Sequence, residues 1–398
     1  MRYEENRLSF CAILLAAYFA IAPVHQTLLL SNGSTVNKYF AFAIMILLFL
    51  KNRCFTSDLS NLFIPIAAYA VISIIWSGSL GESITSVISL ISFLAFALIV
   101  STNEWSNKDK KIILSAYVLA STYYAVMLVI AQNTMRRSTF LGIGGKTADQ
   151  NILAINISIA VLILVRFFYA SEHLIYRMCS LVLAGVILLG IFATGSRGAI
   201  VAASIGMIYI VTKASISSKG KIRTILIGII LLCFILYIMG GNTKLGQIVM
   251  ERMFSSASYQ DAGTNRFNIW KAHLTILMHR PWGLLMGFGF GGENAAYRSY
   301  YGTSWSQATH QDILNMICYG GLPLLLLFAR PIRYVMRKAK REDNILGYAW
   351  MLMAIIAGLS VDYYLTYGWW NALIMAYIGA DSAFKSPQII DHEHGNND

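Results

Sequence analysis

Residues 151–169 read NILAINISIAVLILVRFFY, a run in which Arg166 is the only charged residue. A helix needs about 20 mainly apolar residues to cross the hydrocarbon core of a bilayer, which is roughly 30 Å thick. The whole 398-residue chain shares this character, because 57% of its residues are hydrophobic, 13% are charged and its mean hydropathy is +0.59. This balance predicts an all-α polytopic membrane protein with a single integral membrane domain over residues 1–398.

Apolar segments of similar length recur along the chain and predict about twelve transmembrane helices. They lie near residues 8–30, 36–51, 60–78, 83–102, 111–131, 151–169, 178–194, 198–213, 222–241, 312–329, 345–364 and 368–383. The first segment is longer than a typical signal-peptide core and lacks a convincing cleavage site, so we expect it to remain as the first helix. Residues 240–311, between the ninth and tenth segments, are too polar for a bilayer and predict a large loop outside it.

Lysine and arginine gather in short loops on one side of this layout, with the densest run at Arg330–Arg341. Positive charges in short loops are retained in the cytoplasm, so this side and both termini are predicted to be cytoplasmic. The 240–311 loop then faces the periplasm or the cell exterior. Topology and anionic lipid explain the net charge of +12 better than a nucleic-acid partner, which would require a compact basic domain.

The sequence carries no signature of a nucleotide-driven pump or a metalloenzyme. It has no G-x-x-x-x-G-K-[ST] motif, no H-E-x-x-H motif, and five cysteines without metal-ligand or disulfide spacing. Ion-coupled transporters usually place acidic residues within helices and often show an internal repeat. Here Asp362 is the main acidic residue in a predicted helix, and the two halves of the chain show no evident similarity. We therefore expect no metal and no cofactor.

A short turn that contains an arginine joins the seventh and eighth segments. Residues 194–199 read TGSRGA, and the two glycines permit backbone conformations that other residues resist. Arg197 is then predicted at the level of the lipid headgroups. Its guanidinium either snorkels to the interface, as arginines at helix ends commonly do, or binds phosphate, for which its planar fork is suited.

A second arginine opens a predicted amphipathic helix in the polar loop. Residues 264–273 read TNRFNIWKAH and follow the turn-prone residues 261–263. Apolar residues then recur at helical spacing: Phe267, Trp270, Leu274 and Leu277. We expect this helix to lie on the membrane surface with Trp270 at the interface. Arg266 falls in its first predicted turn, where free backbone N–H groups favour an anion, and an exposed surface arginine is the alternative.

Residues 281–292 read PWGLLMGFGFGG, a glycine-rich stretch without the Lys-[ST] context of a phosphate-binding loop. We interpret it as a close-packed turn that supports the site. Aromatic side chains in this loop and after it suit stacking on a glycan or on lipid headgroups: Trp282, Phe288, Tyr297, Tyr300, Tyr301 and Trp305.

A histidine stands just before the tenth segment. Residues 308–315 read ATHQDILN, and residues 319–323 read YGGLP, which predicts a break or kink in the following helix. An imidazole changes charge near neutral pH and can take a proton from a sugar hydroxyl, so His310 is the candidate general base. A capping or interfacial histidine is the alternative. His273 and His279 lie along the amphipathic segment without an accompanying motif.

The order of these motifs resembles that of the O-antigen ligase and O-antigen polymerase superfamily. The resemblance rests on the TGSRGA turn, the N-R-x-x-x-W helix with its glycine-rich loop, and the T-H-[NQ] entry into a G-G-L-P helix, over about residues 145–330. The stretches KTADQN at 146–151 and WSGS at 76–79 add weaker similarity. This chain has Gln311 where the family usually has asparagine.

The resemblance implies a metal-independent, inverting glycosyltransferase of the bacterial inner membrane, which takes a glycan from undecaprenyl diphosphate at the periplasmic face. Arg197 and Arg266 would bind the diphosphate, and His310 would act as general base on the acceptor hydroxyl. Two arginines could supply the charge stabilisation that a metal gives in soluble transferases. The supporting residues would be Asp362, Gln311 and Trp270.

Two activities share this machinery. A polymerase transfers the growing chain to the next lipid-linked repeat unit, and a ligase transfers the finished glycan to lipid A-core. Ligases often carry a second histidine two positions before the catalytic one, and Ala308 stands there, which slightly favours a polymerase. The implied partners are the lipid-linked donor, a saccharide or lipid A-core acceptor, membrane lipid and a chain-length regulator. A lipid-linked sugar flippase or exporter is an alternative from another class, and it would not need His310.

Overall fold

The computed structural model describes residues 9–29, 35–52, 57–131, 147–214, 247 and 256–384. The described chain is helical, and it includes an isolated β-bridge between Leu29 and Thr35. The predicted all-α fold is therefore confirmed for the part of the chain that the structure describes.

The longer intervals after residues 131 and 213 contain residues outside the described ranges, and most of the described helices otherwise follow one another after short connections. In order they are α1 (Phe10–Ile21), η1 (Ala22–Thr27), α2 (Val36–Asn52), α3 (Ser60–Ser73), η2 (Ile74–Trp76), α4 (Leu80–Thr102), α5 (Asn107–Ala131), α6 (Gln150–Ala170), α7 (Leu174–Thr194), α8 (Arg197–Lys213), α11 (Ser256–His279), α12 (Gly283–Met286), α13 (Glu293–Tyr301), α14 (Asp312–Arg341), α15 (Ile345–Gly358), α16 (Tyr367–Ile378) and η4 (Ala380–Phe384).

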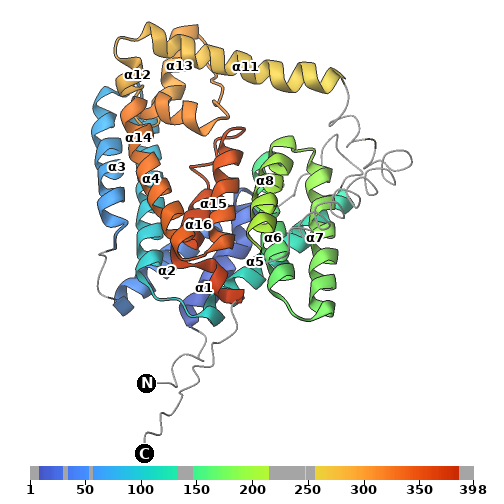
Figure 1. Ribbon diagram of the computed structural model, residues 1–398. Coiled ribbons are helices and arrows are strands. Elements are labelled where there is room, and N and C mark those ends of the chain that lie inside the picture. The colour runs from blue at the N-terminus through green and yellow to red at the C-terminus, as the bar shows by residue number, and fades with distance from the viewer. Residues whose placement is uncertain are drawn as a thin grey trace, which may run out of the picture.

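Most of these helices form a bundle, and α11 lies across one end of it, with α12 and α13 beside it (Figure 1). The core runs through α6, α15 and α16. Residues 153–164 of α6 are buried without interruption, and the indole rings of Trp350, Trp369 and Trp370 are almost fully buried. A helix that is apolar on all sides is stable only when other helices surround it, so the composition of these segments places them at the centre.

The predicted apolar segments form helices wherever the structure describes them, and the segment 222–241 lies outside the described residues. Among the described residues, six helical segments are long and apolar enough to cross a bilayer: Phe10–Thr27, α4, α5, α6, α7 and α14. The predicted count of about twelve, and the position of the large loop relative to the membrane, stay predictions. One predicted span is shorter than expected, because α15 ends at Gly358 and the residues after it turn away to contact the start of α14.

The first and last described residues of the chain lie on the side of the bundle opposite α11 (Figure 1). The guanidinium of Arg166 in α6 donates two hydrogen bonds, of 2.7 and 2.8 Å, to the carboxylate of Asp381 in η4. Lys110 Nζ donates to Ser382 Oγ at 3.0 Å, and the N–H of Ser9 donates to Asp109 Oδ1 at 3.0 Å. Charged groups at this end are therefore used to tie helices together.

Helix α11 begins earlier than predicted, which changes the surroundings of Arg266. The expected start after residues 261–263 is wrong, because α11 runs from Ser256 to His279 and Arg266 lies in its middle. A single glycine inside a helix costs only about 1 kcal/mol, so the turn-prone triplet does not end it. Free N–H groups of a helix start are not available to Arg266. In addition, Leu277 faces inward with 1% exposure, whereas Phe267 is 65% exposed.

The predicted break in α14 is present and falls at the two glycines of YGGLP. Gly320 has φ −150° and ψ 19°, and Gly321 has φ 65° and ψ −167°, both outside the helical region. Carbonyls near the break find other donors: the N–H of Phe288 donates to Cys318 O at 2.7 Å, and Tyr69 Oη donates to Gly320 O at 2.7 Å. The break therefore becomes the point where the glycine-rich loop attaches.

The glycine-rich loop is close-packed, as predicted. A Cβ on Gly287 would lie 2.7 Å from Cys318 O, and one on Gly289 would lie 2.6 Å from Ser73 O. The guanidinium of Arg280 lies 5.6 Å from the centre of the Phe288 ring and donates to Trp76 O at 3.1 Å. The loop thus fixes α11 and α12 on the bundle through backbone contacts that only glycine permits.

We expect Gly321→Ala to destabilise the protein strongly. Its φ and ψ fall in a region that is essentially restricted to glycine, and a Cβ there would lie 2.4 Å from the carbonyl carbon of Leu285. We expect the free energy of unfolding to fall by about 3 kcal/mol or more. This decrease would appear as a lower thermal unfolding temperature of the purified protein in detergent.

Gly185→Ala is the matched control for this prediction. Gly185 lies within α7, and nothing lies within 4 Å of the position of an added Cβ. Alanine should stabilise this helix slightly, because glycine is less favourable there by roughly 0.5–1 kcal/mol. Equal unfolding temperatures for the two variants would contradict the role assigned to Gly321.

Candidate active site

The TGSRGA turn is a tight link between α7 and α8. Gly195 caps α7 in the left-handed conformation with φ 65°, and its N–H donates to Phe192 O at 2.9 Å. Arg197 is the first residue of α8. A Cβ on Gly198 would lie 2.4 Å from Ser360 Oγ, so glycine lets the turn pack directly on the segment that follows α15.

The charges of Arg197 and Arg266 interact in the folded protein, although 69 positions separate the two residues in the sequence. Burial lowers the pKa of the half-buried Arg266, and the charge of Arg197 lowers it further, whereas Asp149 and Asp362 oppose the decrease. Two guanidinium groups that repel each other are stabilised by nearby carboxylates or by an anionic ligand. The structure therefore brings together the two arginines that the sequence analysis selected as the anion-binding pair.

Asp149 joins this neighbourhood, and the sequence analysis assigned it no role. Its carboxylate caps α6 by accepting from the N–H groups of Asn151 and Ile152, both at 2.9 Å, and its own N–H donates to Gln26 Oε1 at 2.8 Å. An aspartate before an apolar helix is a recognisable N-cap signal. Its effect on Arg266 has no sequence signal, because it depends on how α6 and α11 are placed relative to each other.

His310 is exposed, and its backbone is held in an uncommon conformation by Asp362. His310 has φ 51°, in the left-handed region that residues other than glycine rarely adopt. The carboxylate of Asp362 accepts from His310 N at 3.0 Å, from Gln311 N at 2.9 Å and from Thr309 Oγ1 at 2.7 Å. One carboxylate thus holds three consecutive residues and fixes the direction in which the imidazole leaves the chain.

A second carboxylate makes the reciprocal contact. Asp312, the first residue of α14, accepts from Tyr363 N at 2.5 Å and from Tyr364 N at 3.1 Å. A Cβ on Gly358 would lie 2.0 Å from Asp312 Oδ2, so the glycine at the end of α15 makes room for this carboxylate. Residues 309–312 and 362–364 therefore hold each other through side chain to backbone bonds in both directions.

The other two predicted supporting residues, Trp270 and Gln311, each contribute a hydrogen bond at the His310 segment. The indole N–H of Trp270 donates to Thr309 O at 2.9 Å, so Trp270 ties α11 to the His310 segment. Gln311 contributes its backbone N–H to Asp362. Asparagine or glutamine at this position would serve that bond equally, because the side chain takes no part in it.

We expect Asp362→Ala to reduce the proposed transfer activity by about tenfold or more. The left-handed conformation of a residue such as His310 costs roughly 1–2 kcal/mol, and the variant removes the three hydrogen bonds that hold it. Asp362→Asn should fall between wild type and alanine, because one acceptor oxygen remains. Initial transfer rates measure the effect. The exposed Asp343, just beyond the far end of α14, provides the control Asp343→Asn, and wild-type rates in Asp362→Ala would contradict the assignment.

His273 and Glu293 form a buried pair, for which the sequence predicted no role. His273 Nε2 is 3.2 Å from Glu293 Oε1, and the side chains are 0% and 3% exposed. Glu293 Oε2 accepts from Asn315 Nδ2 at 2.7 Å, and Asn315 Oδ1 accepts from Tyr364 Oη at 2.8 Å. A glutamate at the start of a short polar helix normally reads as an exposed residue. Only packing reveals that it faces a histidine.

The predicted aromatic residues separate into buried and exposed groups. Phe288 and Tyr297 are 1% and 6% exposed, so they belong to the core and do not offer a face to a ligand. Trp282, Tyr300, Tyr301 and Trp305 are exposed. Stacking on a glycan therefore stays a hypothesis for these four residues alone.

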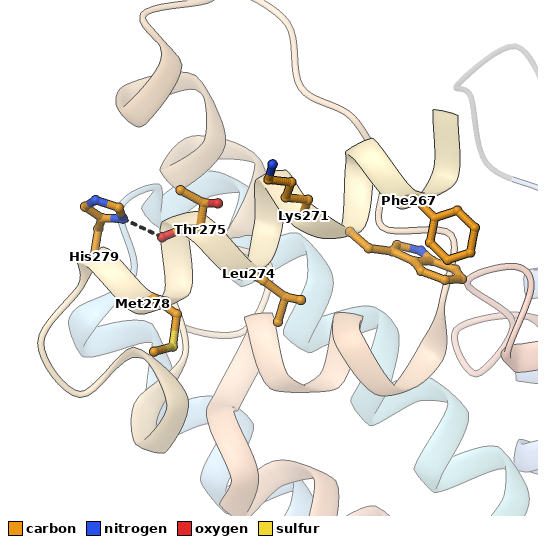
Figure 2. Close-up of a pocket in the computed structure, with 7 residues that line it drawn as sticks. Phe267, Lys271, Leu274, Thr275, Met278 and His279 are labelled. Carbon is orange, nitrogen blue, oxygen red and sulfur yellow. Dashed lines mark hydrogen bonds between the residues drawn. The ribbon is translucent and has the colours of Figure 1, made fainter. Parts of the chain in front are cut away.

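The outer face of α11 forms an open groove of about 460 Å³ (Figure 2). Its apolar lining includes Phe267, Leu274 and Met278, and Lys271 and His279 also border it. His279 Nδ1 lies 2.8 Å from Thr275 O and is engaged along the helix. Apolar side chains of α11 are therefore exposed at this groove, whereas Ile276 and Leu277 of the same helix are buried, and the predicted amphipathic placement on the membrane surface stays a prediction.

These features define a helical membrane protein with paired arginines and a carboxylate-held histidine at one end of its bundle. Residues 180–329 match the family model described as O-Antigen ligase. The match confirms the resemblance to the O-antigen ligase and polymerase superfamily, and its span contains Arg197, Arg266 and His310. No curated protein matches the chain. Asp149 and Asp362 lie outside the matched span, so only the fold connects them with the site.

Proposed function

We propose that the protein is a membrane glycosyltransferase that takes a glycan from undecaprenyl diphosphate and joins it to a saccharide acceptor. The reaction takes place at the periplasmic face of the bacterial inner membrane, in the assembly of O-antigen or another surface polysaccharide. The observation that carries the proposal is the common neighbourhood of Arg197 and Arg266 beside the Asp362-held His310 segment.

The arginine pair serves the donor. A lipid diphosphate is a competent leaving group, and its departure increases the negative charge on the diphosphate oxygens. Two guanidinium groups fixed in advance at that point stabilise the increase without rearranging during the reaction. The repulsion between Arg197 and Arg266 favours the bound dianion, because the ligand offsets both charges.

His310 serves the acceptor. The acceptor hydroxyl oxygen attacks the anomeric carbon, and the bond from that carbon to the phosphate oxygen breaks and leaves its electron pair on the diphosphate. The hydroxyl proton passes to the imidazole of His310 and then to solvent. Direct attack inverts the anomeric centre. The exposed imidazole is accessible to an acceptor from outside the bundle.

Polymerase and ligase activity differ in the acceptor. Ala308, in place of the second histidine that ligases often carry, favours transfer to the next lipid-linked repeat unit. The description of the matched family, O-Antigen ligase, favours transfer to lipid A-core as the second candidate. Both candidates use the same arginines and the same histidine.

The lipopolysaccharide profile of a strain that lacks the gene tests the proposal and separates the two candidates. Core that carries a single repeat unit would identify a polymerase, because ligation continues without chain growth. Bare core together with long lipid-linked polymer would identify a ligase. Complementation with the wild-type gene is the control. An unchanged profile, with no change in any pool of lipid-linked glycan, would contradict the proposed function.

A further inference from the structure

The His273–Glu293 pair is the strongest unassigned feature among the described residues. Both ring nitrogens of His273 face acceptors: Nδ1 lies 2.9 Å from Ile269 O, and Nε2 lies 3.2 Å from Glu293 Oε1. A neutral imidazole has only one N–H, whereas an imidazolium donates from both nitrogens. The surroundings therefore favour a charged histidine opposite a charged glutamate.

The electrostatics of His273 agree with this geometry. Burial alone would lower the pKa of His273, but the Glu293 carboxylate and the Ile269 carbonyl outweigh burial and raise it. The Asp362 carboxylate also raises the pKa of His273. Burial raises the pKa of Glu293, and the imidazole opposes that increase. The Nε2 contact is mainly ionic, because its geometry does not meet the criteria of a hydrogen bond.

The pair connects the segments that carry the proposed catalytic groups. His273 lies in α11, seven residues after Arg266 and three after Trp270, which binds Thr309 O beside His310. Glu293 in α13 leads through Asn315 of α14 to Tyr364, whose N–H binds Asp312. Tyr364 is two residues after Asp362. Four chain segments are thus linked through buried polar side chains.

A buried ion pair is an inefficient way to obtain stability alone. Removing two charges from water costs several kcal/mol per ion, and apolar residues of similar volume often serve equally well. Within the small core cluster of Ile276, Leu277, Phe288, Tyr297, Leu314 and Cys318, apolar side chains are already available. The hydrogen bond from Asn315 Nδ2 to Glu293 Oε2 depends on both distance and angle, so together with the ion pair it sets the relative position of the helices more strictly than apolar packing does.

We propose that the His273–Glu293 ion pair is a positioning element of the transferase site, which holds α11, and with it Arg266, in register with the His310 segment. The inference rests on the proposed function for its catalytic consequence. The geometric claim, that the pair fixes α11 relative to residues 308–311, stands without it.

The test replaces both charged residues together, in His273→Leu/Glu293→Leu. Three quantities are measured on full-length protein in detergent: the thermal unfolding temperature, the affinity for farnesyl diphosphate as a short isoprenyl diphosphate probe, and the rate of glycan transfer. We expect an unfolding temperature close to wild type, because an apolar pair replaces an ion pair. The affinity and the transfer rate should each fall about tenfold or more. Affinity and rate within twofold of wild type would overturn the proposal.

A second variant keeps the test decisive if the double variant does not fold. Glu293→Gln has the same shape, can still accept from Asn315 Nδ2, and removes only the charge. We expect about a tenfold slower transfer and a lower unfolding temperature, because the buried imidazolium loses its counter-ion, and wild-type transfer would again overturn the proposal. Arg166→Met is the matched control, because it removes the Arg166–Asp381 pair at the opposite end of the bundle and should leave probe affinity unchanged.

A distance measurement separates failure of this inference from failure of the proposed function. Spin labels on the exposed residues Lys271 and Ala308, in a background with serine in place of the native cysteines, report the position of α11 without any substrate. We expect the distance distribution to broaden in the double leucine variant. If wild type neither binds the probe nor transfers glycan, the proposed function fails. An unchanged distance distribution overturns the positioning role itself.

Discussion

His310→Ala is expected to abolish glycan transfer while the protein remains folded in the membrane. A positioned general base contributes roughly 100- to 10,000-fold to rate, and alanine retains the backbone N–H that Asp362 binds. The side chain is exposed, so its removal leaves no buried cavity. The measurement is the rate of transfer by purified protein from a lipid-linked donor, together with the thermal unfolding temperature.

His279→Ala is the control, since His279 is also exposed, its hydrogen bond is to Thr275 of its own helix, and its ring contacts Tyr300 of α13 and no residue of the His310 segment among the contacts described. It should transfer at close to the wild-type rate. The result also decides between classes of protein. A lipid-linked sugar flippase needs no general base, so substantial activity of His310→Ala in cells would contradict the enzyme and favour transport.

Arg197→Ala and Arg266→Ala are each expected to slow transfer by about 100-fold, the loss seen when one fixed charge-stabilising donor is removed from an active site. Lysine at either position should rescue only part of the loss, because an ammonium cannot reproduce the bidentate geometry of a guanidinium. The effect at Arg266 should include weaker donor binding, since Arg266 is half-buried and interacts with the charge of Arg197. Donor affinity and transfer rate at saturating donor are measured separately.

Arg298→Ala is the matched control for the arginine variants. Arg298 belongs to the same polar stretch, but it forms an ion pair with Glu82, and partly exposed pairs of this kind contribute little. The double variant Arg197→Ala/Arg266→Ala should lose less than the product of the single losses, because groups that act as a unit are not additive. Independent, fully additive effects would contradict a shared diphosphate.

Much of the helical architecture follows from apolar runs alone, because a long apolar segment is stable only as a buried or membrane-spanning helix. The break in α14 was equally predictable from the sequence YGGLP at 319–323. The structure places it at Gly320 and Gly321, whose conformations lie outside the helical region. The start of α11 was not. The Asp-Ala-Gly triplet at 261–263 has the composition of a turn, yet the helix continues through it.

The sequence by itself determined the class of the protein and singled out three candidate site residues, because hydropathy and short motifs are local properties of the chain. Tertiary structure alone decided how those residues are combined. The effects of Asp149 and Arg197 on Arg266, the bonds from Asp362 to residues 309–311, and the burial of His273 against Glu293 join segments far apart in sequence. Electrostatic and hydrogen-bond energies depend on distance and burial. The distances between these side chains and their burial are set only when the helices pack.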